Sequence, residues 1–392
     1  GIYTDLEYGP SLILTTLGRF STSDFSTKVF SQKLDGFSAN FNYSAVELTL
    51  TAGTTAFMFA DTGNILTDST TTIMSKTDAT QNSNTVSLYE YILNNDSVTL
   101  LDNPRAVQIA TFTLPELVLK QSFTFSFVAQ EDLRTMISAL KNYSGATESY
   151  ELLQAGEETY YANKGGAVNT QYFGAGISGS FLPMFYHNIF YYFGTGSSLS
   201  YLEDSSSSTG YSYQYTTIIS HMAGFTIDYF MPSIFNSRIS LGVVFGTGDS
   251  DATSYYEGNT EGYYNQFTAI TSGGGGLIFT PGVSNIISGS LSYSIKPFQD
   301  LPLPVIDNMQ IALSYLPFFR IVDGPTSVSE ISSSYSGNYL GSEIDLGLYL
   351  RPFSDLGASL QLGYFIPKSD AFAGSDLEDP SFLAKLNVSL SY

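Results

Sequence analysis

Hydrophobic and polar residues alternate along most of this chain with a period of two, and the alternation is clearest at the C-terminal end. From Phe382 to Tyr392 every even position is apolar, while the positions between are mostly polar, including Lys385. Successive side chains of a β-strand point to opposite faces, so this alternation predicts a strand with one apolar and one polar face. The same pattern recurs at about 122–127, 238–245, 287–296, 309–315, 343–351 and 358–366.

The connections between these predicted strands alternate in length. Short turns are expected at Leu114–Pro115, Phe230–Asn236 and Pro352–Asp355, and long polar stretches at about 61–104, 131–165, 201–217, 248–275, 321–341 and 367–381. Long extracellular loops opposite short periplasmic turns are typical of outer-membrane barrels. We therefore predict an all-β fold: one domain over residues 1–392, forming a closed antiparallel transmembrane β-barrel of about 14 strands, within a range of 12–16.

Composition supports this class and excludes others. Charged residues make up 13% of the chain, against about 25% in a typical soluble domain. The net charge of −21 argues against a nucleic-acid partner, which needs a basic surface, and the absence of cysteine excludes disulfides and thiolate metal sites. The most apolar run, Met184–Phe193, is too short for a transmembrane helix. Gly1 is followed closely by Asp5 and Glu7, the start expected of a secreted chain whose signal peptide has been removed.

Charged residues of the predicted strands fall on the polar phase, which would line the lumen. A charge facing lipid costs about 2–4 kcal/mol near the bilayer midplane, so this placement agrees with a barrel. Such charges could pair to tie neighbouring strands together, or could form a constriction that selects solutes. Glu343, Asp345 and Arg351 share one strand face and are the strongest site candidates. The full set of pore-lining candidates is Arg19, Glu47, Glu116, Lys120, Asp228, Arg238, Lys296, Glu343, Asp345, Arg351 and Lys385.

The long stretches hold 24 of the 36 acidic residues and 5 of the 15 basic ones, so their net charge is −19. The extracellular mouth is therefore expected to be acidic, for solubility or for divalent-cation bridging. One stretch breaks the β pattern, because apolar residues recur at helical spacing within Glu131–Asn142. We predict a short helix there, which either folds inward as a constriction or caps the loops. Its candidate residues are Leu133, Arg134, Met136, Ile137 and Leu140.

Nothing in the sequence indicates an enzyme, a cofactor or a metal site. The two histidines, His187 and His221, lie among aromatic and apolar residues, as expected of amphipathic rings at a membrane interface. The four glycines Gly273–Gly276 are not followed by the Lys-Ser or Lys-Thr of a phosphate loop and suggest a hinge or a strand end.

Several short motifs resemble known families. Leu17-Gly-Arg19, Ser23-Asp24-Phe25-Ser26 and Asp35-Gly36 resemble the opening of alginate-export and related porin-type barrels. Pro104–Val107, Leu114–Glu116, Ala129–Arg134, Gly341–Asp345 and Arg351–Asp355 resemble segments of spirochaetal outer-membrane β-barrels. A C-terminal aromatic such as Tyr392 is, in such barrels, read by the barrel-assembly machinery. The resemblance implies the fold, the outer-membrane location and a channel role. The scattered basic residues depart from the arginine-rich conduit of alginate exporters.

The leading expectation is an integral outer-membrane channel, in a Gram-negative-type envelope, for passive diffusion of small hydrophilic solutes. Its expected partners are outer-membrane lipid, the barrel-assembly machinery and those solutes, with any surface or periplasmic protein partners left open. The first alternative is an occluded barrel whose loops form a surface for adhesion or partner binding. A transporter of hydrophobic substrates ranks lower, because only about ten residues precede the first predicted strand and such transporters usually carry an N-terminal plug.

Overall fold

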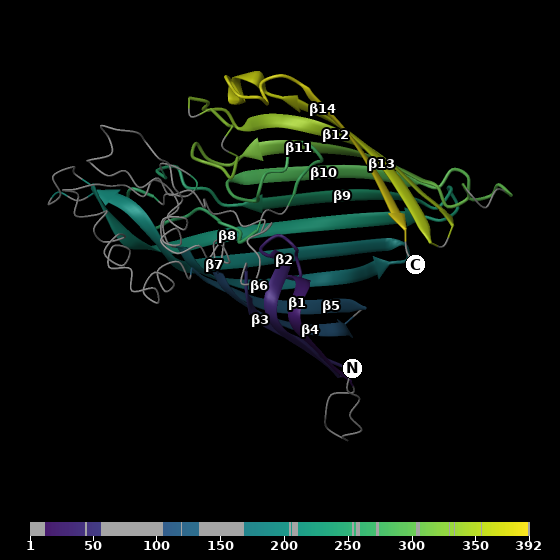
Figure 1. The fold of residues 1–392 in the computed structure, drawn as a ribbon, viewed down its shortest axis with the longest axis horizontal. Helices are drawn as coiled ribbons and strands as arrows, with labels where there is room; N and C mark the ends of the chain where they lie inside the picture. Colours follow the sequence, from purple (N-terminus) through teal and green to yellow (C-terminus); the bar gives the residue numbers. More distant parts are fainter. Residues whose placement is uncertain are drawn as a thin grey trace, which may run out of the picture.

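The described part of the chain folds into one antiparallel sheet of fourteen strands, which lie side by side in the order of the sequence (Figure 1). The computed structural model describes residues 12–43, 45–55, 105–118, 120–132, 168–203, 205, 211–252, 255, 259–271, 274–302, 306–328, 330–332, 334–353 and 355–390. The strands are β1 (Leu12–Ser23), β2 (Ser31–Asn42), β3 (Glu47–Thr54), β4 (Arg105–Val118), β5 (Gln121–Asp132), β6 (Val168–Leu182), β7 (Phe185–Glu203), β8 (Tyr211–Met231), β9 (Ser237–Gly246), β10 (Ile286–Ile295), β11 (Gln310–Arg320), β12 (Tyr339–Phe353), β13 (Leu356–Pro367) and β14 (Ser381–Leu390).

The predicted all-β class and the number of strands are confirmed. Each strand pairs only with its neighbours in the sequence, and the described pairings join β1 to β2 alone and β14 to β13 alone. Closure of the sheet into a barrel therefore stays a prediction. Over the described part of the chain, no helix is long and apolar enough to cross a membrane.

The predicted alternation of connections is present, with two local corrections. Leu114 and Pro115 lie inside β4, where the pairing with β5 shifts register between Leu114 and Val118, and the turn comes after that shift. The β7–β8 connection is shorter than the predicted stretch 201–217, because backbone pairing continues as far as Glu203 and Tyr211. At the other end of the strands, β12 and β13 are joined by the expected tight turn.

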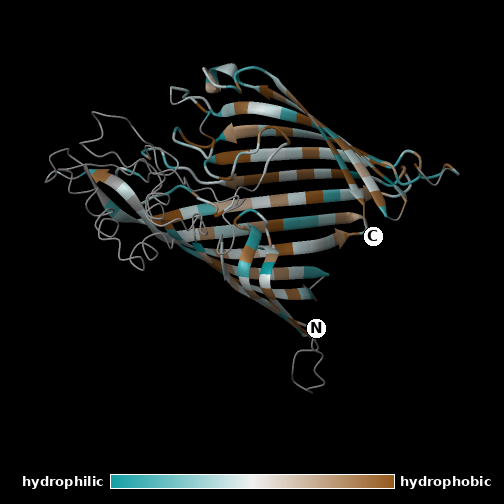
Figure 2. Cartoon of the chain, in the orientation of Figure 1, coloured by the Kyte–Doolittle hydropathy of each residue, from teal (hydrophilic) through white to brown (hydrophobic). Residues whose placement is uncertain are grey.

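One face of the sheet is apolar from strand to strand, as the period of two predicts. A row of directly paired positions runs from Phe112 through Phe125, Ala175 and Tyr191 to Ala223, across β4 to β8. A second row links Leu291, Tyr315, Ile344, Tyr364 and Phe382 across β10 to β14. The hydropathy colouring shows the same alternation along each strand (Figure 2). Most of these large side chains are exposed, which leaves a wide apolar surface.

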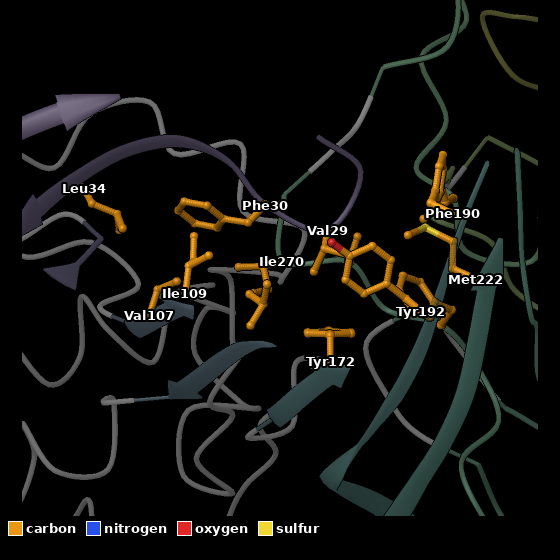
Figure 3. Close-up of a cluster of buried hydrophobic side chains, with 14 residues drawn as sticks. Val29, Phe30, Leu34, Val107, Ile109, Tyr172, Phe190, Tyr192, Met222 and Ile270 are labelled. Atoms are coloured by element: carbon orange, nitrogen blue, oxygen red, sulfur yellow. The ribbon is translucent and has the colours of Figure 1, made fainter. Parts of the chain in front are cut away.

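The sheet is curved, and the opposite face lies on the inside of the curve, so this face is concave (Figure 1). The β1–β2 hairpin stands in front of the other strands in Figure 1, and the Phe25 ring in its turn stacks on Tyr192 of β7 at 5.2 Å between centroids. The buried core lies on this concave face rather than between two layers. It contains Val107, Ile109, Val128, Tyr172, Tyr192 and Met222 from β4 to β8, together with Val29 and Phe30 (Figure 3).

Candidate functional site

The concave face of β8 to β14 carries a polar wall with two adjacent cavities. One, of about 400 Å³, is lined by Arg238, Ser240, Ser292, Ser294, Gln310, Ala312 and Tyr349. The other, of about 270 Å³, shares Gln310 and Tyr349 and extends towards Lys296, Arg351, Ser359 and Asn387. Strand pairing places Arg238, Ser294, Ala312 and Gly347 in one cross-strand row, so their shared face follows directly from the register.

A salt bridge fixes one side of the larger cavity. Arg238 donates from Nε and Nη2 to Oδ1 of Asp228, at 3.0 and 2.7 Å. Its guanidinium also lies 5.4 Å from the centre of the Phe230 ring. Asp228 is buried, whereas the Arg238 side chain is 44% exposed. These contacts hold the guanidinium in one orientation and offset its charge.

The connection between β9 and β10 runs over the concave face. We call residues 247–285 the inner segment; 253–254, 256–258 and 272–273 lie outside the described residues. Tyr264 forms a parallel bridge with Ile218 of β8, its N–H donating to Thr217 O at 3.0 Å and its O accepting from Ile219 N at 2.9 Å. Further along, the hydroxyl of Tyr172 on β6 donates to the carbonyl of Thr268.

The inner segment next contacts the β1–β2 turn. The amides of Ile270 and Thr271 donate to the carbonyl of Val29 at 2.9 and 3.2 Å, and Thr271 Oγ1 accepts from Ser31 N at 2.8 Å. Ile270 and Phe267 are buried in the core of the concave face, and Figure 3 shows Ile270 between Val29, Phe30 and Ile109. Segments far apart in the sequence therefore meet on this face.

Glu343 fastens the far end of the inner segment. Its carboxylate accepts from the amides of Leu277, Ile278 and Phe279 at 2.6, 2.8 and 2.8 Å, and the side chain is fully buried. Three successive amides aimed at one carboxylate form an anion-binding nest. Gly276 allows this approach, since a Cβ there would lie 2.2 Å from Glu343 Oε2.

Aromatic packing reinforces this attachment. The Phe279 ring stacks on Phe365 of β13 at 4.8 Å and meets Phe318 of β11 edge to face at 4.9 Å. Phe372, just after the 3-10 helix η2 (Ser369–Ala371), packs on Phe279 at 5.6 Å. Rings at these separations add about 0.5–1.5 kcal/mol per pair beyond their burial. The inner segment is therefore held at both ends, over β5 to β8 and over β10 to β13.

Glu343 and Asp345 come together above Gly363, as their shared strand face predicts. A Cβ at Gly363 would lie 3.1 Å from Asp345 Oδ1 and 3.3 Å from Glu343 Oε1. Glu343, however, does not border open space, because the inner segment covers it. Arg351, expected to share that face with them, lies farther along β12 at the smaller cavity.

The other predicted lumen residues are distributed over several strands and turns. Arg19 of β1 lies 3.9 Å from Asp35 between Nε and Oδ1, and Glu47 of β3 accepts from Asn40 Nδ2 at 3.0 Å. Glu116 lies at the register shift of β4 with a positive φ, and Lys120 belongs to the turn before β5. Lys296 directly follows β10, and Lys385 lies on β14 opposite Gln361.

The predicted helix over 131–142 lies mostly outside the described residues. Glu131 and Asp132, the expected first residues of this helix, are instead the last two residues of β5, because their backbone pairs with Ala106 and Arg105 of β4. Leu133, Arg134, Met136, Ile137 and Leu140 fall outside the described part, so an inward helix stays a prediction.

Sequence reasoning missed the buried polar groups that organise the concave face. Arg105 is 1% exposed, and its Nη1 donates to Gln130 Oε1 at 3.1 Å and to Val168 O at 3.3 Å. It also missed Asp24, and it missed Tyr349 as a cavity residue. For the attachment at Glu343, the available signal was the run Gly273–Gly276, because glycines beside an apolar Leu-Ile-Phe sequence suit the close approach of another group to the backbone.

The histidine contacts do not form a nucleophile–base pair. His221 Nδ1 lies 2.7 Å from the Tyr191 hydroxyl, and the His187 ring stacks on Phe181 at 4.1 Å. The described residues include no group of three His, Asp or Glu that could hold a metal ion.

No protein-family model and no curated protein sequence matches this chain. Among solved structures, it is similar to OccK3 (OpdO) of Pseudomonas aeruginosa, with 11% identity over 97% of this chain and 76% of that chain, at a TM-score of 0.47. OccK5 (OpdH) of the same organism gives 12% identity over 96% and 77%, at 0.43. A mutant of the ferric enterobactin receptor PfeA of Pseudomonas aeruginosa, in complex with enterobactin, is 8% identical over 97% of this chain and 51% of that chain, at a TM-score of 0.44. Identities and scores this low establish no shared family.

Proposed function

We propose that this chain is an integral protein of a bacterial outer membrane and forms a channel for passive diffusion of small hydrophilic solutes. The inner segment narrows the channel from within. The observation that carries this proposal is the opposition of the two faces: an exposed apolar surface outside, and a polar concave wall with cavities inside. In hydrocarbon, exposed apolar side chains are at no disadvantage, whereas unsatisfied polar groups each cost several kcal/mol.

In this proposal the inner segment forms a constriction, which is one of the two roles expected of the helix over 131–142. It is attached to β8, to the β1–β2 turn and to β12, so it crosses the region through which a solute would pass. The Glu343 nest is the attachment most easily removed by a single substitution. Each hydrogen bond to a charged acceptor contributes about 1.5–3 kcal/mol, so its loss would loosen this end of the segment, which the packing of Phe279 still holds.

Single-channel recording in planar bilayers tests the proposal. We expect the wild-type protein to carry a small ohmic current and Glu343→Gln to carry a larger, noisier one, since a glutamine amide cannot accept all three N–H bonds. Asp370→Asn is the control, because this exposed acid of η2 pairs with Lys368, does not contact the inner segment through its carboxylate and is not a pore-lining candidate. If wild type and Glu343→Gln carry equal current, the channel proposal stands, but the proposal that the inner segment is its constriction is wrong.

Ion selectivity in the same recordings tests the acidic mouth. The net charge of −19 in the long stretches attracts cations, but salt screens it over a Debye length of about 8 Å at physiological ionic strength. We expect a mild cation preference at low salt that fades as salt rises. Strong anion selectivity at every salt concentration would contradict this charge distribution.

The second candidate function is an occluded barrel that presents its loops as a surface for adhesion or partner binding. The attachment of the inner segment at both ends favours it. Protein that inserts in folded form, yet carries no current either as wild type or as Glu343→Gln, would replace the channel proposal with this one.

A further inference from the structure

The geometry points to a binding site for a neutral polyhydroxylated solute, such as a mono- or disaccharide, in the joined cavities of the concave wall. The two cavities have Gln310 and Tyr349 in common, and their volumes of about 400 and 270 Å³ taken together fall in the size range of small-molecule sites. The inference deepens the proposed function and depends on it only for the route by which the solute arrives.

Arg238 supplies oriented donors without a free charge. A guanidinium has five N–H donors, and Asp228 receives bonds from Nε and Nη2 only. The remaining donors border the cavity, because Arg238 lines it while Asp228 is buried. The carboxylate 2.7 Å away offsets the positive charge. A planar donor group with its charge already balanced suits hydroxyl acceptors better than an anion.

Tyr349 supplies an aromatic surface on the opposite side. A Cβ at Gly347 would lie 2.6 Å from Tyr349 Cε2 and 2.8 Å from its hydroxyl, so the absence of a side chain at Gly347 lets the phenol ring lie against the wall. The hydroxyl accepts from Gln361 Nε2 at 3.1 Å, which holds the ring in place, and the residue is 38% exposed. Such a ring can pack against the C–H face of a sugar.

Hydroxyl groups form the floor between these two sides. Ser240, Ser292 and Ser294 border the larger cavity, and Ser292 is hydrogen-bonded to Ser314 of β11 at 2.8 Å. Serine hydroxyls both donate and accept hydrogen bonds, as do the hydroxyls of a sugar. The floor can therefore act as donor or as acceptor towards the solute. Ala312 also lines this cavity, and its small side chain leaves room for a solute above the floor. This combination of oriented donors, a ring and hydroxyls matches a neutral polyol and gives an apolar solute little to contact.

Saturation-transfer NMR with sucrose tests the site without requiring current. The protein is kept in an amine-oxide detergent, because alkyl-maltoside detergents carry the same chemistry as the ligand. We expect signal transfer to the sucrose C–H protons in wild type. Tyr349→Ala should weaken binding about tenfold, equivalent to roughly 1.4 kcal/mol and in the range of one lost aromatic contact. Tyr349→Phe keeps the ring and should stay within about threefold.

The control variant is Tyr315→Ala, which removes a similarly exposed tyrosine from the apolar face of β11. Its binding should equal that of wild type, and heat-modifiable mobility on gels verifies that each variant is folded. If Tyr349→Ala does not fold, Gly347→Ala takes its place, because its Cβ displaces the ring. Binding equal in wild type and the ring-displaced variant overturns the proposal.

Two further outcomes separate this site from the channel. If the protein binds sucrose but carries no current, the binding-site proposal stands and the channel proposal is wrong. Current without sucrose binding sustains the channel and overturns the site. Tighter binding of glucuronate than of glucose would also overturn the neutral-solute assignment and identify Lys296 and Arg351, at the smaller cavity, as an anion site.

Discussion

At the scale of single residues, Asp24 organises the turn between β1 and β2. Its carboxylate, 1% exposed, accepts from the amides of Ser26, Val29 and Phe30, from the Ser26 hydroxyl and from the Tyr192 hydroxyl at 2.9 Å. These bonds satisfy a buried charge and direct Val29 into the contact with the inner segment. Removing the carboxylate leaves several buried donors without an acceptor, each at a cost of about 1–3 kcal/mol.

We therefore expect Asp24→Ala to lower the free energy of unfolding in detergent by on the order of 3 kcal/mol, measured by urea titration. Asp370→Ala is the control: this acid of η2 is 73% exposed and pairs with Lys368 at 2.7 Å. An exposed pair contributes about 0–1 kcal/mol, so this variant should unfold close to wild type. Equal losses in both variants would show that the Asp24 bonds do not stabilise the fold.

At the scale of elements, the inner segment contains a group that makes its stability depend on pH. Burial, together with the neighbouring Asp251, raises the pKa of Asp249 from 3.8 to about 6. Its Oδ2 accepts from Asn265 N at 2.8 Å, which joins the two ends of this loop. A raised pKa means that the folded loop binds the proton more tightly than the unfolded loop does. The stabilisation is thus complete below about pH 4 and is lost as pH rises through about 6.

We expect the amides of 259–271 to be better protected from hydrogen exchange at pH 5 than at pH 7.5, once intrinsic exchange rates are corrected. The difference should be on the order of 1 kcal/mol in opening free energy, because pH 5 lies only about one unit below the folded pKa of about 6. Asp249→Asn should lose this pH dependence, whereas Asp323→Asn, an exposed acid beside Arg320, should keep it. Protection that increases from pH 5 to 7.5 in wild type would contradict the direction of the shift.

At the scale of the whole molecule, the register of the strands decides which residues the proposed membrane barrel presents to lipid. On β14, Leu386 pairs with Leu360 on the apolar face and is 70% exposed, while Lys385 pairs with Gln361 on the polar face. A register slip of one residue would exchange the two faces and bring Lys385 into hydrocarbon. The apolar face continues from β14 to β10 through the paired row Phe382, Tyr364, Ile344, Tyr315 and Leu291, so labelling β14 tests the register of this part of the sheet.

We expect Leu386→Cys in bilayers to react with a lipid-soluble maleimide and Lys385→Cys with a water-soluble one, as measured by mass spectrometry. The chain has no cysteine, so each label reports a single site. The reverse labelling would place the register one residue away from the described pairing.

The period-two alternation by itself determined the strand class and the two faces, whereas the strand number followed only as an estimate of about 14 within a range of 12–16. In a sheet, side-chain direction depends only on whether a position is odd or even, which is a local property. The position of Lys385 opposite the apolar face was therefore predictable, as was the long and short alternation of connections. The same locality explains the error at Leu114–Pro115: proline favours a turn, but tertiary pairing of β4 with β5 continued past it.

Only the tertiary structure decided what covers the concave face. The stretch after β9 has the composition of a solvent-exposed loop, and its turn inward depends on contacts with residues far away in the sequence: Val29, Ile218 and Glu343. No local sequence pattern predicts such contacts, because each of these residues fits the secondary structure of its own segment whether or not the other residue is near. Glu343 looked like a lumen charge because its strand phase was correct. Its role follows instead from three amides of Leu277, Ile278 and Phe279 that the chain brings to it from over 60 residues away.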